Sequence, residues 1–177
     1  MGLTFLVGGA RSGKSALAVE LGRRHRGPVV YVATAPTVDS DMAQRIARHR
    51  VERPGEWRTI EEPTDLAGAL ASAGKSLTIV DCLTLWVSNL MLAELDDDNI
   101  EQRAVAAATA AAAGEVVAVS NEVGLGVHPE LELARRYRDV LGRVNQIWAA
   151  AADPALLLVA GRALPLADPW TYVASVP

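Results

Sequence analysis

Apolar and polar residues follow two rhythms along this chain. Short apolar runs alternate with longer segments in which apolar side chains recur every three or four positions. Runs of the first kind are typical of strands buried on both faces of a parallel sheet, and segments of the second kind are typical of helices that cover a sheet. The expected strands lie at residues 3–7, 29–33, 77–81, 116–120 and 155–160.

The segments between these strands predict the helices. Strand and helix alternate five times, which predicts an α/β fold with three layers, a mainly parallel sheet of about five strands and right-handed crossovers. The run 155–160 is expected to close the sheet, and the tail after Gly161 predicts no element. The other expected elements are helices over 14–24, 64–73, 83–95, 100–113 and 130–152, a helix that begins at Asp39 or Ser40 and ends before Arg53, and a possible edge strand at 57–60.

The first strand leads directly into a phosphate-binding loop motif, G-x4-G-K-S at residues 8–15. Glycines allow the backbone to turn so that successive N–H groups point at nucleotide phosphates, at the positive end of the following helix. In such a loop Lys14 binds the terminal phosphates and Ser15 offers its hydroxyl to Mg²⁺. The position between strand and helix favours a RecA-like phosphate-loop fold over a Gly/Ser loop before an ordinary helix. The residues expected to contact nucleotide here are Gly8, Gly9, Ala10, Arg11, Ser12, Gly13, Lys14 and Ser15.

Polar residues also follow the later strands, and ligands of doubly wound sheets bind beyond the carboxyl ends of the strands. Asp81 ends an apolar run, as does the aspartate that holds Mg²⁺ directly or through water in phosphate-loop enzymes. Thr34 follows the second strand, either as part of the same site or as a threonine that only ends a strand. The glycine-rich segment 121–129 is predicted to be a substrate loop, in which His128 either faces the substrate or is only a loop residue before proline.

A local positive patch lies on the expected helix before Arg53. Arg45 and His49 are four residues apart and therefore share a helix face, and two further arginines adjoin His49. Such a patch suits a polyphosphate in a chain that is otherwise acidic. A solvated helix face is the alternative interpretation.

Composition restricts the class of protein. The chain has 177 residues, half of them hydrophobic, which is enough for one core, so a single domain over 1–177 is expected. The net charge of −4 and the presence of only two lysines argue against nucleic acid as a partner. The single cysteine, Cys82, excludes an internal disulfide framework and is expected to be a small buried side chain. Without a membrane-length apolar run or a charged leader, a cytoplasmic protein is expected.

Two helical segments carry more apolar surface than one small sheet requires. Apolar residues cover most of the circumference of segment 83–95, and a long seam runs along 130–152. Both belong either to the core or to a subunit contact, and together they suggest a homo-oligomer. Residues 96–98, three consecutive aspartates, are predicted to form a solvated loop rather than a metal site.

Six segments in order resemble one family, the bifunctional adenosylcobinamide kinase / adenosylcobinamide-phosphate guanylyltransferases of cobalamin biosynthesis. They are Gly-Gly-Ala-Arg-Ser-Gly-Lys-Ser (8–15), Tyr-Val-Ala-Thr-Ala (31–35), Met-x-x-Arg-Ile-x-x-His-x-x-x-Arg-Pro (42–54), Asp-Cys-Leu-Thr-Leu-Trp-Val-Ser-Asn (81–89), Asn-Glu-Val-Gly-Leu-Gly (121–126) and Arg-x-x-x-Gly-Arg-Val-Asn-Gln (138–146). The likeness runs from about residue 3 to 160 and implies a phosphate-loop fold that assembles as a homotrimer.

The resemblance also implies an activity. It implies that the protein phosphorylates the aminopropanol hydroxyl of adenosylcobinamide, with GTP or ATP as substrates and Mg²⁺ as cofactor, and then transfers GMP from GTP to the new phosphate. His49 occupies the position of the histidine that becomes guanylylated, and Lys14 of the phosphate loop is the second expected catalytic residue. The further residues that the resemblance assigns to nucleotide binding are Ala33, Thr34, Ala35, Arg45, Arg50, Val51, Glu52, Arg53, Glu61 and Asp81.

Two other classes of function compete with this interpretation. One is an ordinary small-molecule kinase, in which His49 only lines the site. The other is a nucleotide-dependent switch or binding module, which in the GTPase form should carry an Asn-Lys-x-Asp guanine motif. The chain has no such motif, which counts against the switch and leaves guanine specificity to the resemblance.

Overall fold

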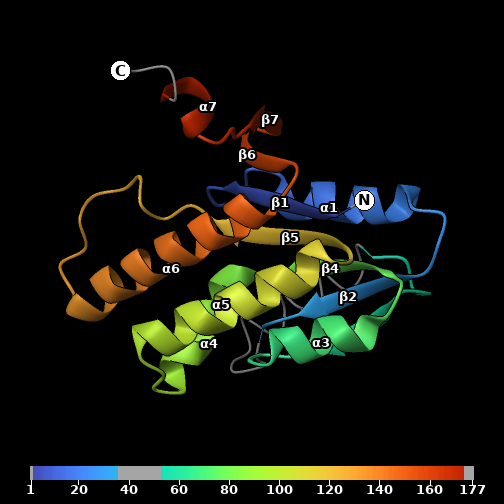
Figure 1. The fold of residues 1–177 in the computed structure, drawn as a ribbon, viewed down its shortest axis with the longest axis horizontal. Coiled ribbons are helices and arrows are strands. Elements are labelled where there is room, and N and C mark those ends of the chain that lie inside the picture. The colour runs from blue at the N-terminus through green and yellow to red at the C-terminus, as the bar shows by residue number, and fades with distance from the viewer. Residues whose placement is uncertain (1, 36–52, 174–177) are drawn as a thin grey trace.

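One sheet with strand order β3-β2-β4-β5-β1-β6-β7 forms the centre of the computed structural model, which describes residues 2–35 and 53–173 (Figure 1). Neighbouring strands run parallel except β6 and β7, which are antiparallel. The mainly parallel α/β fold is therefore confirmed. The strands are β1 (Leu3–Gly8), β2 (Val29–Ala33), β3 (Arg58–Glu61), β4 (Leu77–Asp81), β5 (Glu115–Asn121), β6 (Ala155–Val159) and β7 (Arg162–Pro165).

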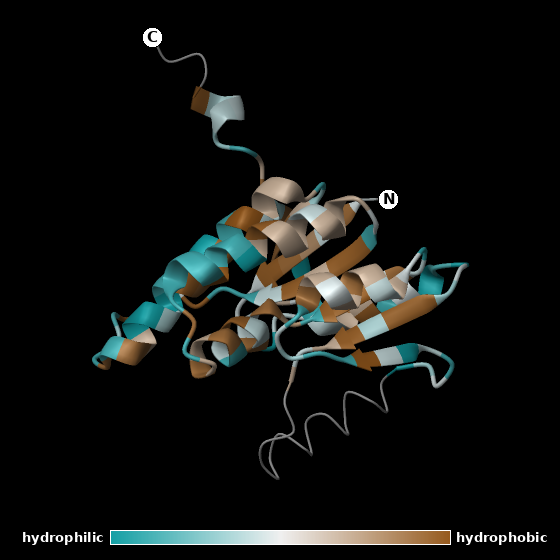
Figure 2. Ribbon diagram, turned by 60° about the horizontal axis from the view of Figure 1, so that its bottom comes forward, coloured by the Kyte–Doolittle hydropathy of each residue, from teal (hydrophilic) through white to brown (hydrophobic). Residues whose placement is uncertain are grey.

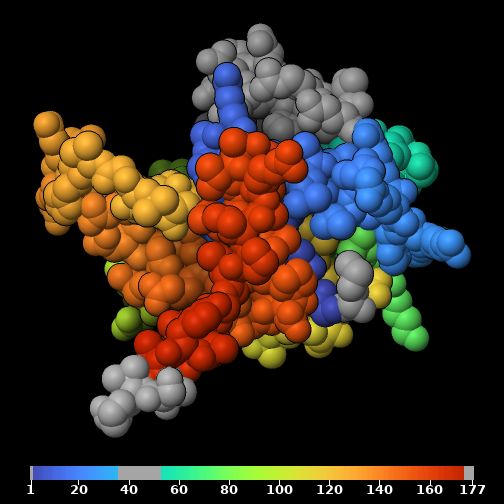
Figure 3. All heavy atoms as spheres, turned by 90° about the horizontal axis from the view of Figure 1, so that it is seen from above, coloured from blue at the N-terminus to red at the C-terminus, as the bar shows by residue number. Residues whose placement is uncertain are grey.

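The sequence predicts that the sheet ends at the run 155–160, but the structure has one more strand beyond β6. Ala160 and Gly161 both have positive φ, 50° and 74°, and they turn the chain back so that β7 pairs with β6. Two successive residues with positive φ are the requirement of a tight hairpin turn whose twist matches that of its strands. The tail therefore adds an antiparallel edge strand, and Figure 3 shows it in red across the surface, beside the blue N-terminal segment.

Helices cover both faces of the sheet and give the expected three layers. Helix α1 packs on β1, β4 and β5, whereas α3, α4, α5 and α6 form the layer on the other face. The short helix α7 is exposed and stands away from the body of the molecule (Figure 2). The helix expected before Arg53 lies outside the described residues. The helices are α1 (Lys14–Arg24), α3 (Leu66–Ala73), α4 (Leu83–Leu92), α5 (Asp97–Ala112), α6 (Glu132–Ala151) and α7 (Trp170–Val173).

The three consecutive aspartates begin a helix and do not form the predicted loop. The Asp96 carboxylate accepts the Asn99 N–H at 2.8 Å and caps α5, and the next two aspartates form the first turn. Negative charge at this end of a helix is stabilising because it faces the positive end of the helix dipole. Asp97 also pairs with Arg136 and Arg143 of α6, so it joins two helices.

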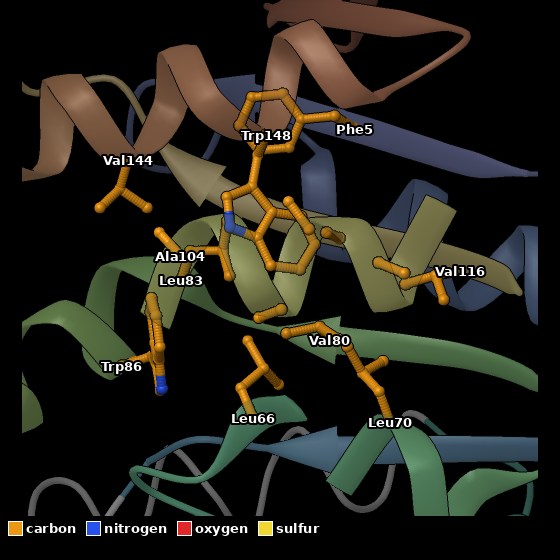
Figure 4. Close-up of a cluster of buried hydrophobic side chains, with 14 of the residues drawn as sticks. Phe5, Leu66, Leu70, Val80, Leu83, Trp86, Ala104, Val116, Val144 and Trp148 are labelled. Atoms are coloured by element: carbon orange, nitrogen blue, oxygen red, sulfur yellow. The ribbon is translucent and has the colours of Figure 1, made fainter. Parts of the chain in front are cut away.

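The larger of two hydrophobic cores fills the space between the sheet and the layer of α3 to α6 (Figure 4). Trp86 of α4 and Trp148 of α6 are 1% and 0% exposed, and Leu90 and Val144 are buried beside them. The apolar strands and the polar outer face of α6 can be followed in Figure 2. These two helices thus bury most of their apolar residues within the monomer, whereas Leu92 of α4 and Leu133 of α6 are 75% and 65% exposed.

Candidate nucleotide-binding site

The loop between β1 and α1 needs glycine at two positions. Gly8 has φ 155°, and a Cβ atom there would lie 2.3 Å from the carbonyl oxygen of Leu158 on β6. Gly13 has φ 101°, and it immediately precedes α1. The Ser12 N–H donates to the Gly9 carbonyl at 3.3 Å and closes the turn. The motif thus forms a tight loop against β6 that opens onto the N-terminus of a helix, which is the arrangement that binds phosphate.

Lys14 lies folded back over this loop. Its side chain is buried, and Nζ donates to the Gly9 carbonyl oxygen at 2.7 Å and to Ser12 Oγ at 3.3 Å. Burial lowers the pKa of Lys14, and the nearby Cys82 and Asp81 oppose that shift. A buried ammonium held by neutral oxygens gains from an additional anion, because those oxygens do not neutralise its charge.

Asp81 ends β4 and lies near this ammonium. Its Oδ2 atom accepts a hydrogen bond of 2.5 Å from the hydroxyl of Tyr31 on β2. Burial, followed by the charge of Asp81, raises the pKa of Tyr31 far above its usual range, so the phenol remains a neutral donor. The guanidinium carbon of Arg53 lies 3.6 Å from the centroid of the Tyr31 ring.

Thr34 holds the ends of β2 and β4 together. The residue is fully buried, and its hydroxyl donates to the Cys82 carbonyl at 2.7 Å and accepts the Cys82 N–H at 2.8 Å. The side-chain amide of Asn89 on α4 donates to the Thr34 carbonyl at 2.8 Å and to the Pro63 carbonyl at 3.0 Å. Cys82 is partly buried, and burial raises the pKa of its thiol to about 11, so it remains protonated.

A second polar network fixes the end of β5. Ser120 Oγ donates to Asn145 Oδ1 at 2.6 Å, and Asn145 Nδ2 donates to the Asn121 carbonyl at 3.0 Å. The hydroxyl of Thr84 accepts the Asn121 N–H at 2.8 Å. Sequence reasoning did not identify Asn89, Thr84 or Asn145 individually. Their only signal was that they lie within the family segments 81–89 and 138–146.

The glycine-rich segment that follows β5 is open to solvent. The Glu122 N–H donates to the Gly8 carbonyl at 3.1 Å, so the segment starts beside the phosphate loop. Leu125 and Val127 are 87% and 95% exposed. His128 is also exposed, and its Nδ1 lies 2.9 Å from an Arg138 guanidinium nitrogen. The role of segment 121–129 as a substrate loop stays a prediction.

A family model described as "Cobinamide kinase / cobinamide phosphate guanyltransferase" matches residues 4–166. The chain belongs to this family. It is 45% identical over 166 residues to the "Bifunctional adenosylcobalamin biosynthesis protein CobP" of Pseudomonas aeruginosa, covering 91% of this chain and 95% of that protein. It is 38% identical over 175 residues to the corresponding protein "CobU" of Escherichia coli, covering 90% of this chain and 96% of that one. The family suggested by the six segments is therefore confirmed.

A solved structure supports the fold of this cobinamide kinase / guanyltransferase family member. The flagellar accessory protein FlaH from Methanocaldococcus jannaschii superposes with a TM-score of 0.50 at 14% identity, covering 93% of this chain and 77% of that one. At this identity the likeness concerns the fold alone. This likeness in fold is consistent with the expected RecA-like phosphate-loop architecture.

The described part of this family member brings many of the predicted site residues to one edge of the sheet. The loop 8–15 begins at the end of β1, residues 33–35 lie at the end of β2 and just after it, and Asp81 ends β4. Glu61 ends β3 in register with Ala33. The predicted residues Arg45, His49, Arg50, Val51 and Glu52 lie outside the described residues.

The described residues limit how a metal ion could be bound. Outside the gap at 36–52 and the chain ends, no group of three or more His, Cys, Asp or Glu side chains could hold a metal ion. A magnesium ion at Asp81 and Ser15 would therefore take its other ligands from water and phosphate, as Mg²⁺ usually does in kinases. Among the described helices, none has the length and apolarity needed to cross a membrane.

Proposed function

We propose that this chain phosphorylates adenosylcobinamide with ATP or GTP, and then transfers GMP from GTP to adenosylcobinamide phosphate through His49. The observation that carries the proposal is the buried Lys14 ammonium inside a phosphate loop, with Asp81 nearby, in a chain that matches the family over residues 4–166. The products are adenosylcobinamide-GDP and pyrophosphate.

The kinase step requires mainly positioning and charge. Backbone N–H groups of the loop and the Lys14 ammonium bind the β- and γ-phosphates, and the substrate hydroxyl attacks the γ-phosphorus as the bond to the β-phosphate breaks. The proton of that hydroxyl passes to solvent or to a base. Lys14 Nζ is held in place by two neutral oxygens, the Gly9 carbonyl and the Ser12 hydroxyl.

The guanylyl step requires a nucleophile. An imidazole with a pKa near 6.5 is largely neutral at pH 7, so a His49 nitrogen can attack the α-phosphorus of GTP as pyrophosphate leaves. The phosphate of the second substrate then displaces the histidine, and the imidazole is restored. We assign the binding of GTP in this step to the loop 8–15, with Ala33, Thr34, Ala35, Arg45, Arg50, Val51, Glu52, Arg53 and Glu61.

The oxygen ligands near the loop fit a magnesium ion. The carboxylate of Asp81 and the hydroxyl of Ser15 are the hard ligands that Mg²⁺ prefers, and both are partly exposed at the same edge of the sheet. When bound, the ion supplies positive charge that neutralises the phosphates. We propose that these two residues hold it.

A labelling experiment tests the nucleophile. The wild-type protein and the His49→Ala variant are incubated with GTP labelled at the α-phosphate, and the covalent adduct is mapped by peptide analysis. The variant should lose the adduct and the formation of adenosylcobinamide-GDP but keep much of its kinase activity. His25→Ala is the matched control, since His25 lies at the other end of α1 from the loop and should leave the adduct unchanged.

Three outcomes would contradict parts of this proposal. An adduct that persists in His49→Ala would show that another residue is the nucleophile. Loss of both activities in a folded variant would favour the ordinary-kinase interpretation. Turnover in Lys14→Ala equal to that of the wild type would refute the phosphate-loop assignment itself.

We also propose that the protein acts as a homotrimer, as the family resemblance implies, and that it does so in the cytoplasm. Exposed aromatic side chains at the C-terminal end support an interface of some kind, because Trp170 and Tyr172 are 70% and 71% exposed. Sedimentation at micromolar concentration tests the assembly, and a monomer there would contradict it.

A further inference from the structure

Tyr31 is the residue that joins two groups of the site while remaining almost inaccessible itself. Strands β2 and β4 are parallel, with Tyr31 opposite Ile79 and Ala33 opposite Asp81. Side chains two residues apart on a strand lie on the same face, so the Tyr31 ring extends along the sheet face towards Asp81. The ring is 3% exposed, which leaves it little surface with which to touch a nucleotide.

The hydroxyl of Tyr31 fixes one oxygen of Asp81. The distance of 2.5 Å to Oδ2 is that of a short hydrogen bond to a charged acceptor, the stronger class of hydrogen bond in proteins. This hydrogen bond holds one oxygen of the Asp81 carboxylate and limits rotation of the group.

The face of the same ring supports a cation. The Arg53 guanidinium stacks on it at 3.6 Å, a distance at which cation–π attraction is favourable. The Tyr31 side chain therefore binds an acidic group through its edge and a basic group through its face. A buried tyrosine that served packing alone would need neither neighbour.

We propose that Tyr31 is a positioning residue, which holds the Asp81 carboxylate for the magnesium–nucleotide complex and the Arg53 guanidinium for the nucleotide. The inference rests on the proposed function, in that it takes Asp81 and Arg53 as site residues. Tyr31 acts through the hydroxyl on the first and through the ring on the second, so the two effects can be separated by substitution.

Nucleotide affinity, measured with and without Mg²⁺, tests this separation. The probe is a non-hydrolysable GTP analogue, and its Kd is measured by calorimetry in Mg²⁺ and in EDTA. Tyr31→Phe keeps the ring and should reduce the enhancement of affinity by Mg²⁺ about tenfold, with the Kd in EDTA unchanged, because a hydrogen bond to a charged group is lost. Tyr31→Leu should in addition weaken binding in EDTA severalfold, because the support for Arg53 is lost.

Two controls distinguish positioning from general stability. Tyr137→Phe also removes a tyrosine hydroxyl, which donates to the Thr84 carbonyl at 3.1 Å, and it should leave the Mg²⁺ enhancement unchanged. In an Asp81→Asn background, Tyr31→Phe should reduce the enhancement no further, since the carboxylate that Tyr31 is proposed to position for Mg²⁺ is already absent. An unchanged Mg²⁺ enhancement in Tyr31→Phe, or additive losses in the double variant, would overturn the inference.

The binding assay separates this inference from the proposed function. It requires no turnover, so a wild-type protein without guanylyl transfer would refute the function and leave the result for Tyr31 intact. Conversely, if the wild-type protein is fully active and Tyr31→Phe shows the same Mg²⁺ enhancement of nucleotide affinity as the wild type, the positioning role alone is refuted.

Discussion

Replacing Gly8 by alanine should destabilise the protein even without nucleotide. A Cβ atom at Gly8 would lie 2.3 Å from the Leu158 carbonyl oxygen, about 1 Å closer than an ordinary contact allows. Gly8 and Leu158 are paired across β1 and β6, so the oxygen cannot retreat without disturbing this part of the sheet. The clash therefore has no flexible side chain to absorb it.

The expected magnitude follows from two costs and one gain. Overpacking of this kind costs about 1–3 kcal/mol, and alanine at a positive φ costs about 1–2 kcal/mol. The reduced freedom of the unfolded chain returns about 0.4–1 kcal/mol. The net loss is about 3 kcal/mol, which for a protein of this size lowers the melting temperature by roughly 6–12 °C.

Thermal unfolding followed by circular dichroism, in nucleotide-free buffer, measures this loss. Gly9→Ala is the matched control in the same loop, because a Cβ atom there meets nothing within 4 Å. It should melt within about 2 °C of the wild type. Equal melting temperatures for Gly8→Ala and Gly9→Ala would refute the argument that the backbone of β6 closes the space beside Gly8.

Two further predictions concern the core and a helix cap. Trp86→Phe should lower the free energy of unfolding in urea by about 1–2 kcal/mol more than Trp148→Phe does. The reason is that the Trp86 indole N–H donates to the Thr64 carbonyl at 2.9 Å, whereas the indole N–H of Trp148 has no partner in the described part of the chain. Equal losses in the two variants would contradict this. Hydrogen bonds from Asn99 lower the pKa of Asp96 in the folded state, so its contribution to stability is present above the unfolded pKa of 3.8 and is lost as the pH falls below it. Asp96→Ala should therefore lower the melting temperature at pH 7 and differ less from the wild type at pH 3, while Asp96→Asn, which keeps a capping oxygen, should change little at pH 7.

The parts of the fold that could be predicted are those whose residues repeat a physical pattern. The bounds of α1, β2 and β4 agree with the sequence prediction because strands buried on both faces have no polar positions, and because Gly27-Pro28 cannot continue a helix. The phosphate loop could be predicted because its glycines are required by local backbone geometry. Such constraints act within a few residues of one another.

The parts that were missed depend on distant partners. The residues of β7 are all exposed, and the tail after Gly161 carries no alternation of apolar and polar residues that would predict a strand. The charge of residues 96–98 alone predicts a solvated loop. The positive end of a helix dipole, however, makes a cluster of aspartates a suitable helix start. The role of Asn89 is defined by two backbone carbonyls far away in the sequence, for which no local pattern exists.

The hairpin between β6 and β7 has a consequence for the order in which the site can form. Its Gly161 N–H donates to the Ser12 carbonyl at 3.0 Å, and the Gly161 Cα lies 3.5 Å from the position of a Cβ on Gly13. The phosphate loop is synthesised about 150 residues before this hairpin, which forms one wall of the loop and follows every strand but β7 in the chain. Pairing of such high sequence separation forms slowly, and a nascent chain that has reached only α6 still lacks this wall. A growing chain should therefore gain its full affinity for nucleotide only when the hairpin between β6 and β7 closes.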